Sequence, residues 1–452
     1  MIFFAHKPKI EQTFEFWRLI LKSLAIILNV LLVSISSFAA TTVHNVSLDE
    51  AVKLAKENSE DLELSIQAIE NNESIYREVL GTALPQLTFD ATWQKYFMKP
   101  VFFGSAVDLN YQLISTLSVS QTLWAFGRVG AAIDAAKAGK QLGELDKQLT
   151  EDQIEYLARA AYYSALFSKK NLEIANQSLA SAKQNLSILQ QKFSGGRPPQ
   201  SDLVRLQADV ASRIPQVKTA ELNYKQAKWS LAQVIGVSLE EEVNLTTKFD
   251  QAFKVLAYDK LKEKLNDKVP SIQALDQSIA YAAESAKVYN AADLPTITAV
   301  AAYSYAGAGS DPLTSEDLRS SSYAGVNISW NIWDGGSTRA KAQQARINKK
   351  IAELTKKKQL EGLELKLAQT WKTYQALVES HDSAKKAVQL AERSFKIAQK
   401  RFRTGQTSLT EMNSTDLALT QARIGLAQNI FAIHDTLAQL ANILSLNPGE
   451  LL

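Results

Sequence analysis

The sequence predicts an α+β membrane protein made of one unit written twice, with four amphipathic β-strands per chain and very long helices. Three observations predict it: a repeat at a shift of 209 residues, four segments of alternating polar and apolar residues, and two proline-free helical segments of about 68 residues. Four strands cannot close a membrane barrel, which takes about eight or more, and lipid does not tolerate an open sheet edge. The chain is therefore expected to oligomerise.

The N-terminus, residues 1–39, is expected to be a secretory signal peptide. Four basic residues precede an apolar run from Leu24 to Ile35, and Ser37 and Ala39 stand at positions −3 and −1 of the expected cleavage site. The apolar run is much shorter than the roughly 20 residues of a spanning helix, although a signal anchor is the alternative.

Composition excludes several classes of function. The chain has no Cys and only four His, so disulfides, thiolate metal sites and cysteine nucleophiles are excluded. No phosphate-binding glycine loop is found, and His381 and His434 lie in helical segments where we expect them to be solvated. Without residues 1–39 the chain has 46 basic and 45 acidic residues, which gives no sign of nucleic-acid binding. We expect no catalytic residues, no metal site and no cofactor, hence no enzyme.

The internal repeat sets the domain organisation. A shift of 209 pairs Trp124 with Trp333 and Phe193 with Phe402, whereas nearer the start a shift of 210 pairs Pro85 with Pro295. The one-residue difference falls between Pro85 and Leu117, where we expect a hairpin loop. The predicted boundaries are 46–241 for repeat 1, 242–256 for a linker and 257–450 for repeat 2.

Each repeat carries two predicted strands, at about 86–97 and 111–124 and at about 296–305 and 322–333. In the first of them Leu87, Phe89, Ala91 and Trp93 alternate with polar residues, which indicates one apolar face. A soluble sandwich is the alternative. Small polar residues on the other face, and Tyr or Trp toward the strand ends, favour membrane strands around a wet lumen.

The helices form two predicted hairpins. Long helices at 126–193 and 335–402 are followed by return helices at 201–236 and 410–445, and a helix from Ser47 to Leu84 precedes the first strand. The long helices have the pattern of a coiled coil and are roughly 100 Å long at 1.5 Å per residue. Pro215 is expected to kink the first return helix, and Gly139 with Gly143 marks close helix packing.

Two kinds of motif resemble the TolC family of outer-membrane efflux proteins, over 46–452. Leu123-Trp124-Ala125-Phe126-Gly127-Arg128 and Ile332-Trp333-Asp334-Gly335-Gly336 resemble the family's passage from strand to long helix. Gln191-Lys192-Phe193-Ser194-Gly195-Gly196 and Lys400-Arg401-Phe402-Arg403-Thr404-Gly405 resemble its helix tips.

The resemblance implies a homotrimer in the outer membrane of a Gram-negative bacterium. Twelve strands would form one barrel in outer-membrane lipid, continuous with a helical coiled-coil barrel that extends into the periplasm. Its tips would meet a periplasmic adaptor protein attached to an inner-membrane transporter. Implied entrance and gating residues are Gly196, Arg197, Asp202, Arg403, Gly405 and Glu411. Implied adaptor contacts are Gly195, Pro198, Pro199, Gln406, Thr407 and Ser408.

The expected function is a passive exit duct of a tripartite efflux pump that exports small molecules. The exit channel of a type I protein secretion system is the alternative, and a periplasmic adaptor or structural coiled-coil protein is a further one. Asp202 and Glu411 match the acidic entrance positions of the family, whereas Ser414 stands where some members carry a second acid. Both acids could instead serve the N-termini of the return helices.

Overall fold

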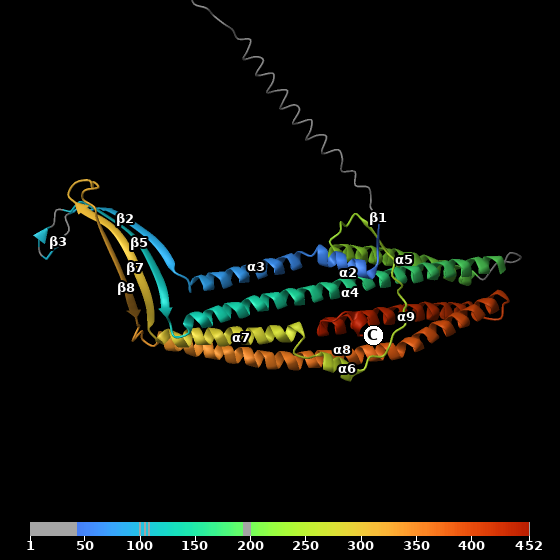
Figure 1. Ribbon diagram of the computed structural model, residues 1–452. Coiled ribbons are helices and arrows are strands. Elements are labelled where there is room, and N and C mark those ends of the chain that lie inside the picture. Colours follow the sequence, from blue (N-terminus) through green and yellow to red (C-terminus); the bar gives the residue numbers. More distant parts are fainter. Residues whose placement is uncertain (1–42, 99–100, 104, 107–108, 193–199, 452) are drawn as a thin grey trace, which may run out of the picture.

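The computed structural model describes residues 43–98, 101–103, 105–106, 109–192 and 200–451, so the predicted signal peptide lies outside the described part. A curved sheet stands at one end of a long helical rod (Figure 1). The first copy contains β1 (Val43–Val46), α2 (Leu48–Glu57), α3 (Glu60–Gly81), β2 (Gln86–Lys95), β3 (Val101–Phe102), β4 (Ser105–Ala106), β5 (Tyr111–Trp124), α4 (Arg128–Lys192), α5 (Gln200–Ile235) and β6 (Glu242–Leu245). The second copy contains α6 (Tyr258–Lys264), α7 (Pro270–Asn290), β7 (Thr296–Gly309), β8 (Arg319–Ser329), α8 (Ser337–Arg403) and α9 (Leu409–Leu444).

The sheet joins the two copies. Its strand order is β2-β5-β7-β8, all antiparallel, so β5 of the first copy pairs with β7 of the second. Compared with the expected ranges, the structure ends β2 at Lys95, extends β7 to Gly309, and places β8 at Arg319–Ser329. Within the described residues, β2 and β8 are edges without a partner strand.

The two faces of this sheet differ in chemistry. On one face Phe89 and Trp93 of β2 and Ile328 of β8 are more than 60% exposed. On the other face hydroxyls bond between strands: Thr88 Oγ1 lies 2.6 Å from Ser118 Oγ, and Thr116 Oγ1 lies 3.1 Å from Ser304 Oγ. The alternation of the sequence therefore appears as one apolar and one hydroxyl-lined face.

The long helices α4 and α8 run from the sheet to the far end of the rod, and α5 and α9 return along them (Figure 1). They contain 65 and 67 residues. Where a Cβ is added to Gly143 of α4, it would lie 2.5 Å from Asn72 Nδ2 of α3, so the expected close helix packing at this glycine is observed. Helix α5 continues without interruption through Pro215.

The helix expected from Ser47 to Leu84 is divided, so the prediction of one helix was wrong. Helix α2 ends at Glu57, and Ser59 caps α3 by accepting a hydrogen bond from Leu62 N at 3.2 Å. Asn58, at the break, donates from Nδ2 to the Ile235 carbonyl at 2.9 Å. The residue between α2 and α3 is therefore hydrogen-bonded to the end of α5.

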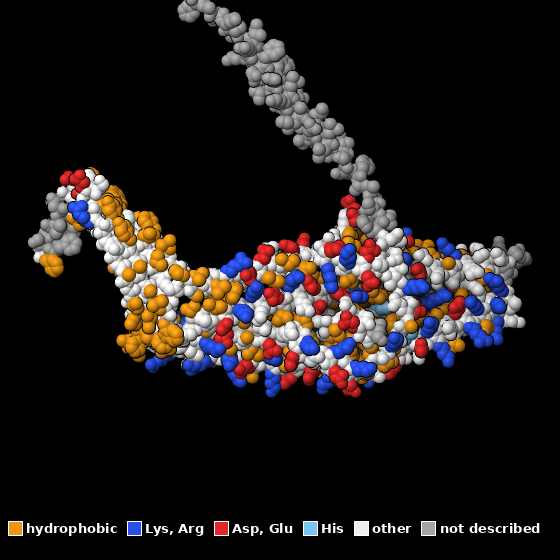
Figure 2. Space-filling model, viewed as in Figure 1, with side chains coloured by type: hydrophobic (Ala, Val, Ile, Leu, Met, Phe, Trp, Pro, Cys, Tyr) orange, Lys and Arg blue, Asp and Glu red, His pale blue; other side chains and the backbone are white. Residues whose placement is uncertain are grey.

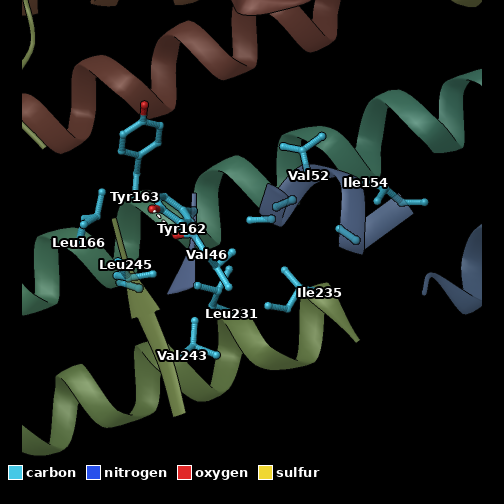
Figure 3. Close-up of a cluster of buried hydrophobic side chains, with 14 residues drawn as sticks. Val46, Val52, Ile154, Tyr162, Tyr163, Leu166, Leu231, Ile235, Val243 and Leu245 are labelled. Carbon is cyan, nitrogen blue, oxygen red and sulfur yellow. Dashed lines mark hydrogen bonds between the residues drawn. The ribbon is translucent and has the colours of Figure 1, made fainter. Parts of the chain in front are cut away.

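A buried core lies near the middle of the rod, around β1 and α2 (Figure 1), and Figure 3 shows its side chains. Strand β1 pairs in parallel with β6, which lies in the segment expected to be a plain linker. Tyr162 of α4 is fully buried beneath this pair and donates its hydroxyl hydrogen bond to the Val46 carbonyl at 2.9 Å. Helices α2, α4 and α5 and the paired strands β1 and β6 thus share one apolar core.

The chain between β6 and α6 is tied to the second copy through its carbonyl groups. Trp371 Nε1 donates to the Leu256 carbonyl at 2.8 Å, and the Tyr374 hydroxyl donates to the Lys254 carbonyl at 2.9 Å. His434 Nε2 lies 3.2 Å from the Phe249 carbonyl, and because a carbonyl only accepts, this nitrogen carries the proton.

The expectation that the two helical histidines are solvated was wrong. His381 and His434 are both buried, and the His434 ring stacks on Tyr163 with centroids 3.8 Å apart. Burial lowers the pKa of His434 to about 4. The imidazole is therefore a neutral part of the core.

Candidate functional site

The candidate site is the end of the rod opposite the sheet, where both helical hairpins turn. Helix α4 ends at Lys192 and α5 begins at Gln200, so five predicted site residues of the first tip lie outside the described residues. They are Gly195, Gly196, Arg197, Pro198 and Pro199. The second tip is described completely.

The second tip is a tight turn centred on a glycine. Gly405 has φ +77°, a conformation that side chains disfavour, and Gln406 N donates back to the Arg401 carbonyl at 2.8 Å. This arrangement ends α8 at Arg403 and satisfies carbonyls that its last turn leaves open.

The return helix of the second tip starts with a capping motif. Ser408 accepts a hydrogen bond from Glu411 N at 3.1 Å and caps α9, which begins at Leu409, one residue before the expected start. The Thr407 hydroxyl donates to the Glu411 carboxylate. Glu411 is thus bonded within its own turn, as the helix-terminus interpretation expects. Asp202 lies in the first turn of α5.

An apolar cluster joins the two hairpins just above the tips. It draws on both long helices and both return helices, so each hairpin buries side chains against the other. Its buried members are Ile188, Leu189, Leu206, Phe402, Leu409 and Met412.

A buried ion pair lies further up, between the return helices. Arg213 Nη1 of α5 lies 2.6 Å from Asp416 Oδ2 of α9, and the side chains are 4% and 2% exposed. Arg213 also bonds Asp209 on its own helix, and it donates to both the carbonyl and the hydroxyl of Ser178 on α4 at 2.8 Å. Burial raises the pKa of the Asp416 carboxyl, although Arg213 opposes this shift.

This ion pair was not predicted from the sequence. Arg213 stands four residues after Asp209 and resembles an ordinary surface pair within one helix. The available signal was asymmetry between the copies. At the shift of 209, Ala422 corresponds to Arg213 and Gln207 corresponds to Asp416, so neither charge is repeated.

Exposed or half-buried hydrogen bonds also connect the hairpins, and three of them lie in the half of the rod near the tips. Arg205 Nη1 donates to Thr410 Oγ1 at 3.0 Å, nearest the tips. Gln399 Nε2 donates to Asn185 Oδ1 at 3.3 Å, and Arg423 Nη1 donates to Gln177 Oε1 at 2.8 Å. We call these bonds, the apolar cluster and the Arg213–Asp416 pair together the hairpin seam.

No helix in the described part of the chain is long and apolar enough to cross a membrane. Nor do three or more His, Asp or Glu side chains of that part gather where they could hold a metal ion.

Comparison with known proteins agrees with the family resemblance. The chain is 22% identical over 393 residues to the pyoverdine export outer membrane protein OpmQ of Pseudomonas putida, a match covering 83% of this chain and 81% of that protein. Its fold is similar to the outer-membrane channel OprN (TM-score 0.77, 18% identity, 89% and 90% of the two chains). It is also similar to the CmeC outer membrane channel of Campylobacter jejuni (TM-score 0.77, 16% identity, 89% and 88%).

A family model described as outer membrane efflux protein matches residues 51–237 and again 262–445. The two matches correspond to the two copies of the unit and together take in most of the chain. The protein therefore belongs to the outer membrane efflux protein family.

Proposed function

We propose that three copies of this chain form the passive exit duct of a tripartite efflux pump, which exports small molecules across the outer membrane. The observation that carries the proposal is the sheet: one exposed apolar face, one hydroxyl-lined face and two edges that no described strand pairs with. Such a sheet is not stable alone in lipid, because each unsatisfied edge group costs several kcal/mol.

Closure by three copies satisfies both edges. Strand β8 of one chain would pair with β2 of the neighbouring chain, and three four-stranded sheets would give a barrel of twelve strands. The apolar face would contact lipid and the hydroxyl-lined face would surround water, as in outer-membrane barrels.

The helical rod would continue the duct into the periplasm. Its α8 surface carries Ile347, Ile351 and Leu354, each at least half exposed and spaced to share one face. On α3, Leu64 is 67% exposed. Packing of α8 against α3 of a neighbouring copy would cover both and close a helical wall.

The hairpin seam is the proposed place of gating. Opening would move the hairpins apart at 194–202 and 403–411, when a periplasmic adaptor attached to an inner-membrane transporter engages the tips. Gly196, Arg197, Asp202, Arg403, Gly405 and Glu411 remain the proposed entrance residues. Gly195, Pro198, Pro199, Gln406, Thr407 and Ser408 remain the proposed adaptor contacts. Export of small molecules is favoured over polypeptide because the relative OpmQ is named for pyoverdine export.

Cysteine cross-linking tests the proposal cleanly, because the chain has no Cys of its own. Arg205→Cys with Thr410→Cys puts thiols at the hydrogen-bonded seam nearest the tips. Purified trimers in planar bilayers should conduct, a bifunctional thiol reagent with a reducible linker that spans the pair should abolish their open events, and reduction should restore them. The two single-cysteine variants serve as controls and should respond to neither treatment. Protein that purifies only as a monomer, or that never conducts, would contradict the proposal.

A further inference from the structure

Positive charge gathers at the tip end of the rod. The last turns of α8 carry Arg393, Lys396, Lys400, Arg401 and Arg403 against a single acid, Glu392. From residue 174 to its end at 192, α4 carries two lysines and no acid. The chain beyond residue 39 is nearly neutral as a whole, so the excess of basic residues at this end is balanced by acidic residues elsewhere in the chain. Figure 2 shows Lys and Arg side chains at the end of the rod away from the sheet.

These charges are open to solvent and mostly unneutralised. The five basic side chains at the end of α8 are all exposed. Lys396 pairs with Glu392 at 2.9 Å, but among the described residues Arg393, Lys400 and Arg403 make no ion pair. The buried Arg213 and Asp416 cancel one another inside the hairpin seam and add little to the field outside it.

The acids near the tip offset only part of this excess. Asp202 and Glu411, in the first turns of α5 and α9, are fewer than the basic residues at the ends of the long helices. Glu411 also accepts a hydrogen bond from Thr407. The resemblance to the family implies an acidic entrance, whereas the charges of this chain give the opposite sign.

We propose that the periplasmic entrance of this channel is electropositive and favours small anionic solutes over cations. This inference rests on the proposed function, in which three copies bring three such tips around one mouth. Charges of one sign around an opening raise the local concentration of counter-ions about tenfold or more. The effect reaches about 8 Å at physiological ionic strength, so only charges close to the mouth contribute.

Ion selectivity of the full-length trimer tests the inference. The reversal potential is measured in planar bilayers across a KCl gradient, for the wild type and for Arg393→Gln/Lys400→Gln/Arg403→Gln. A matched control, Lys357→Gln/Lys358→Gln/Lys366→Gln, removes the same charge from exposed positions of the same helix. At 1.5 Å per residue these lie roughly 50 Å or more from the tip, several Debye lengths away.

The wild type should prefer chloride over potassium by roughly two- to tenfold at low salt, and the preference should shrink as the salt concentration rises. The tip variant should lose most of the preference, and the control variant should keep it. A cation preference, or an equal loss in both variants, would overturn the inference while conductance upholds the proposed function. Trimers that never conduct would refute the proposed function itself.

Discussion

Arg213 of α5 and Asp416 of α9 form an ion pair of 2.6 Å inside the hairpin seam, almost without solvent contact. Within one chain, the pair joins the return helix of the first repeat to the return helix of the second. Arg213 also donates a hydrogen bond to Ser178 of α4. Removing Asp416 leaves the buried Arg213 with the partly exposed Asp209 carboxylate as its only counter-charge, and breaking a buried pair in this way is costly.

We therefore predict that Asp416→Ala lowers the free energy of unfolding by about 3 kcal/mol, the lower end for a broken buried pair, because Arg213 loses Asp416 and keeps only Asp209 as a counter-charge. The combined replacement Arg213→Met/Asp416→Leu should cost far less, since two apolar side chains of similar volume need no partner. Thermal unfolding followed by circular dichroism at 222 nm measures both. A double variant as unstable as Asp416→Ala would show that the cost comes from packing and not from the stranded charge.

The pH dependence of stability should carry a signature of His434. Burial lowers the pKa of this imidazole to about 4 from 6.5, so the unfolded chain takes up the proton first as the pH falls. Its contribution is therefore complete above about pH 6.5 and is lost between about pH 6.5 and 4. Between pH 7.5 and 5 the loss is about 2 kcal/mol.

His434→Gln should remove that part of the pH dependence while keeping an N–H donor for the Phe249 carbonyl. The measurement is the difference in unfolding free energy between wild type and variant as a function of pH. A difference that stays constant from pH 7.5 to pH 5 would show that the imidazole does not titrate as its burial requires.

Substitution of the glycine at the end of α5 is predicted to destabilise the protein. Gly236 has φ +70°, and an added Cβ would lie 2.3 Å from Asn58 Cβ, at the break between α2 and α3. Gly236→Ala should therefore destabilise by roughly 1 to 3 kcal/mol. Gly425→Ala in α9, where nothing lies within 4 Å of an added Cβ, is the matched control and should stabilise by about 0.5 to 1 kcal/mol. If both variants shift the thermal midpoint in the same direction, the close approach at Asn58 is not what constrains Gly236.

Local pattern was sufficient for much of the fold. The alternation after Pro85 and the proline-free runs placed the strands and long helices because these elements bury or expose side chains with a fixed period. Strand β5 begins and ends where the pattern does, at Tyr111 and Trp124. Turn chemistry likewise located the second tip at Gly405.

What the sequence did not reveal depends on contacts between distant segments. The break at Asn58 is held by a carbonyl 177 residues away, and β1 pairs in parallel with β6 across 199 residues. Neither partner carries a local sign of the other. The ion pair between Arg213 and Asp416, which are 203 residues apart, was not predicted for the same reason.

Two acids, Asp202 and Glu411, are expected at the entrance of the channel. If Asp202 and Glu411 lie near the mouth, they weaken an electropositive field, so Asp202→Asn/Glu411→Gln should increase the preference for chloride. The expected gain is roughly twofold at low salt and should vanish near 1 M salt, where the Debye length is about 3 Å. Glu411→Gln keeps an oxygen that can accept from Thr407, which preserves the turn of the second tip. Reversal potentials of wild-type and variant trimers in a KCl gradient give the comparison, and equal thermal midpoints of the two proteins verify that the tip still folds. Unchanged conductance and selectivity would show that neither carboxylate acts at the entrance and that both only stabilise the N-termini of their helices.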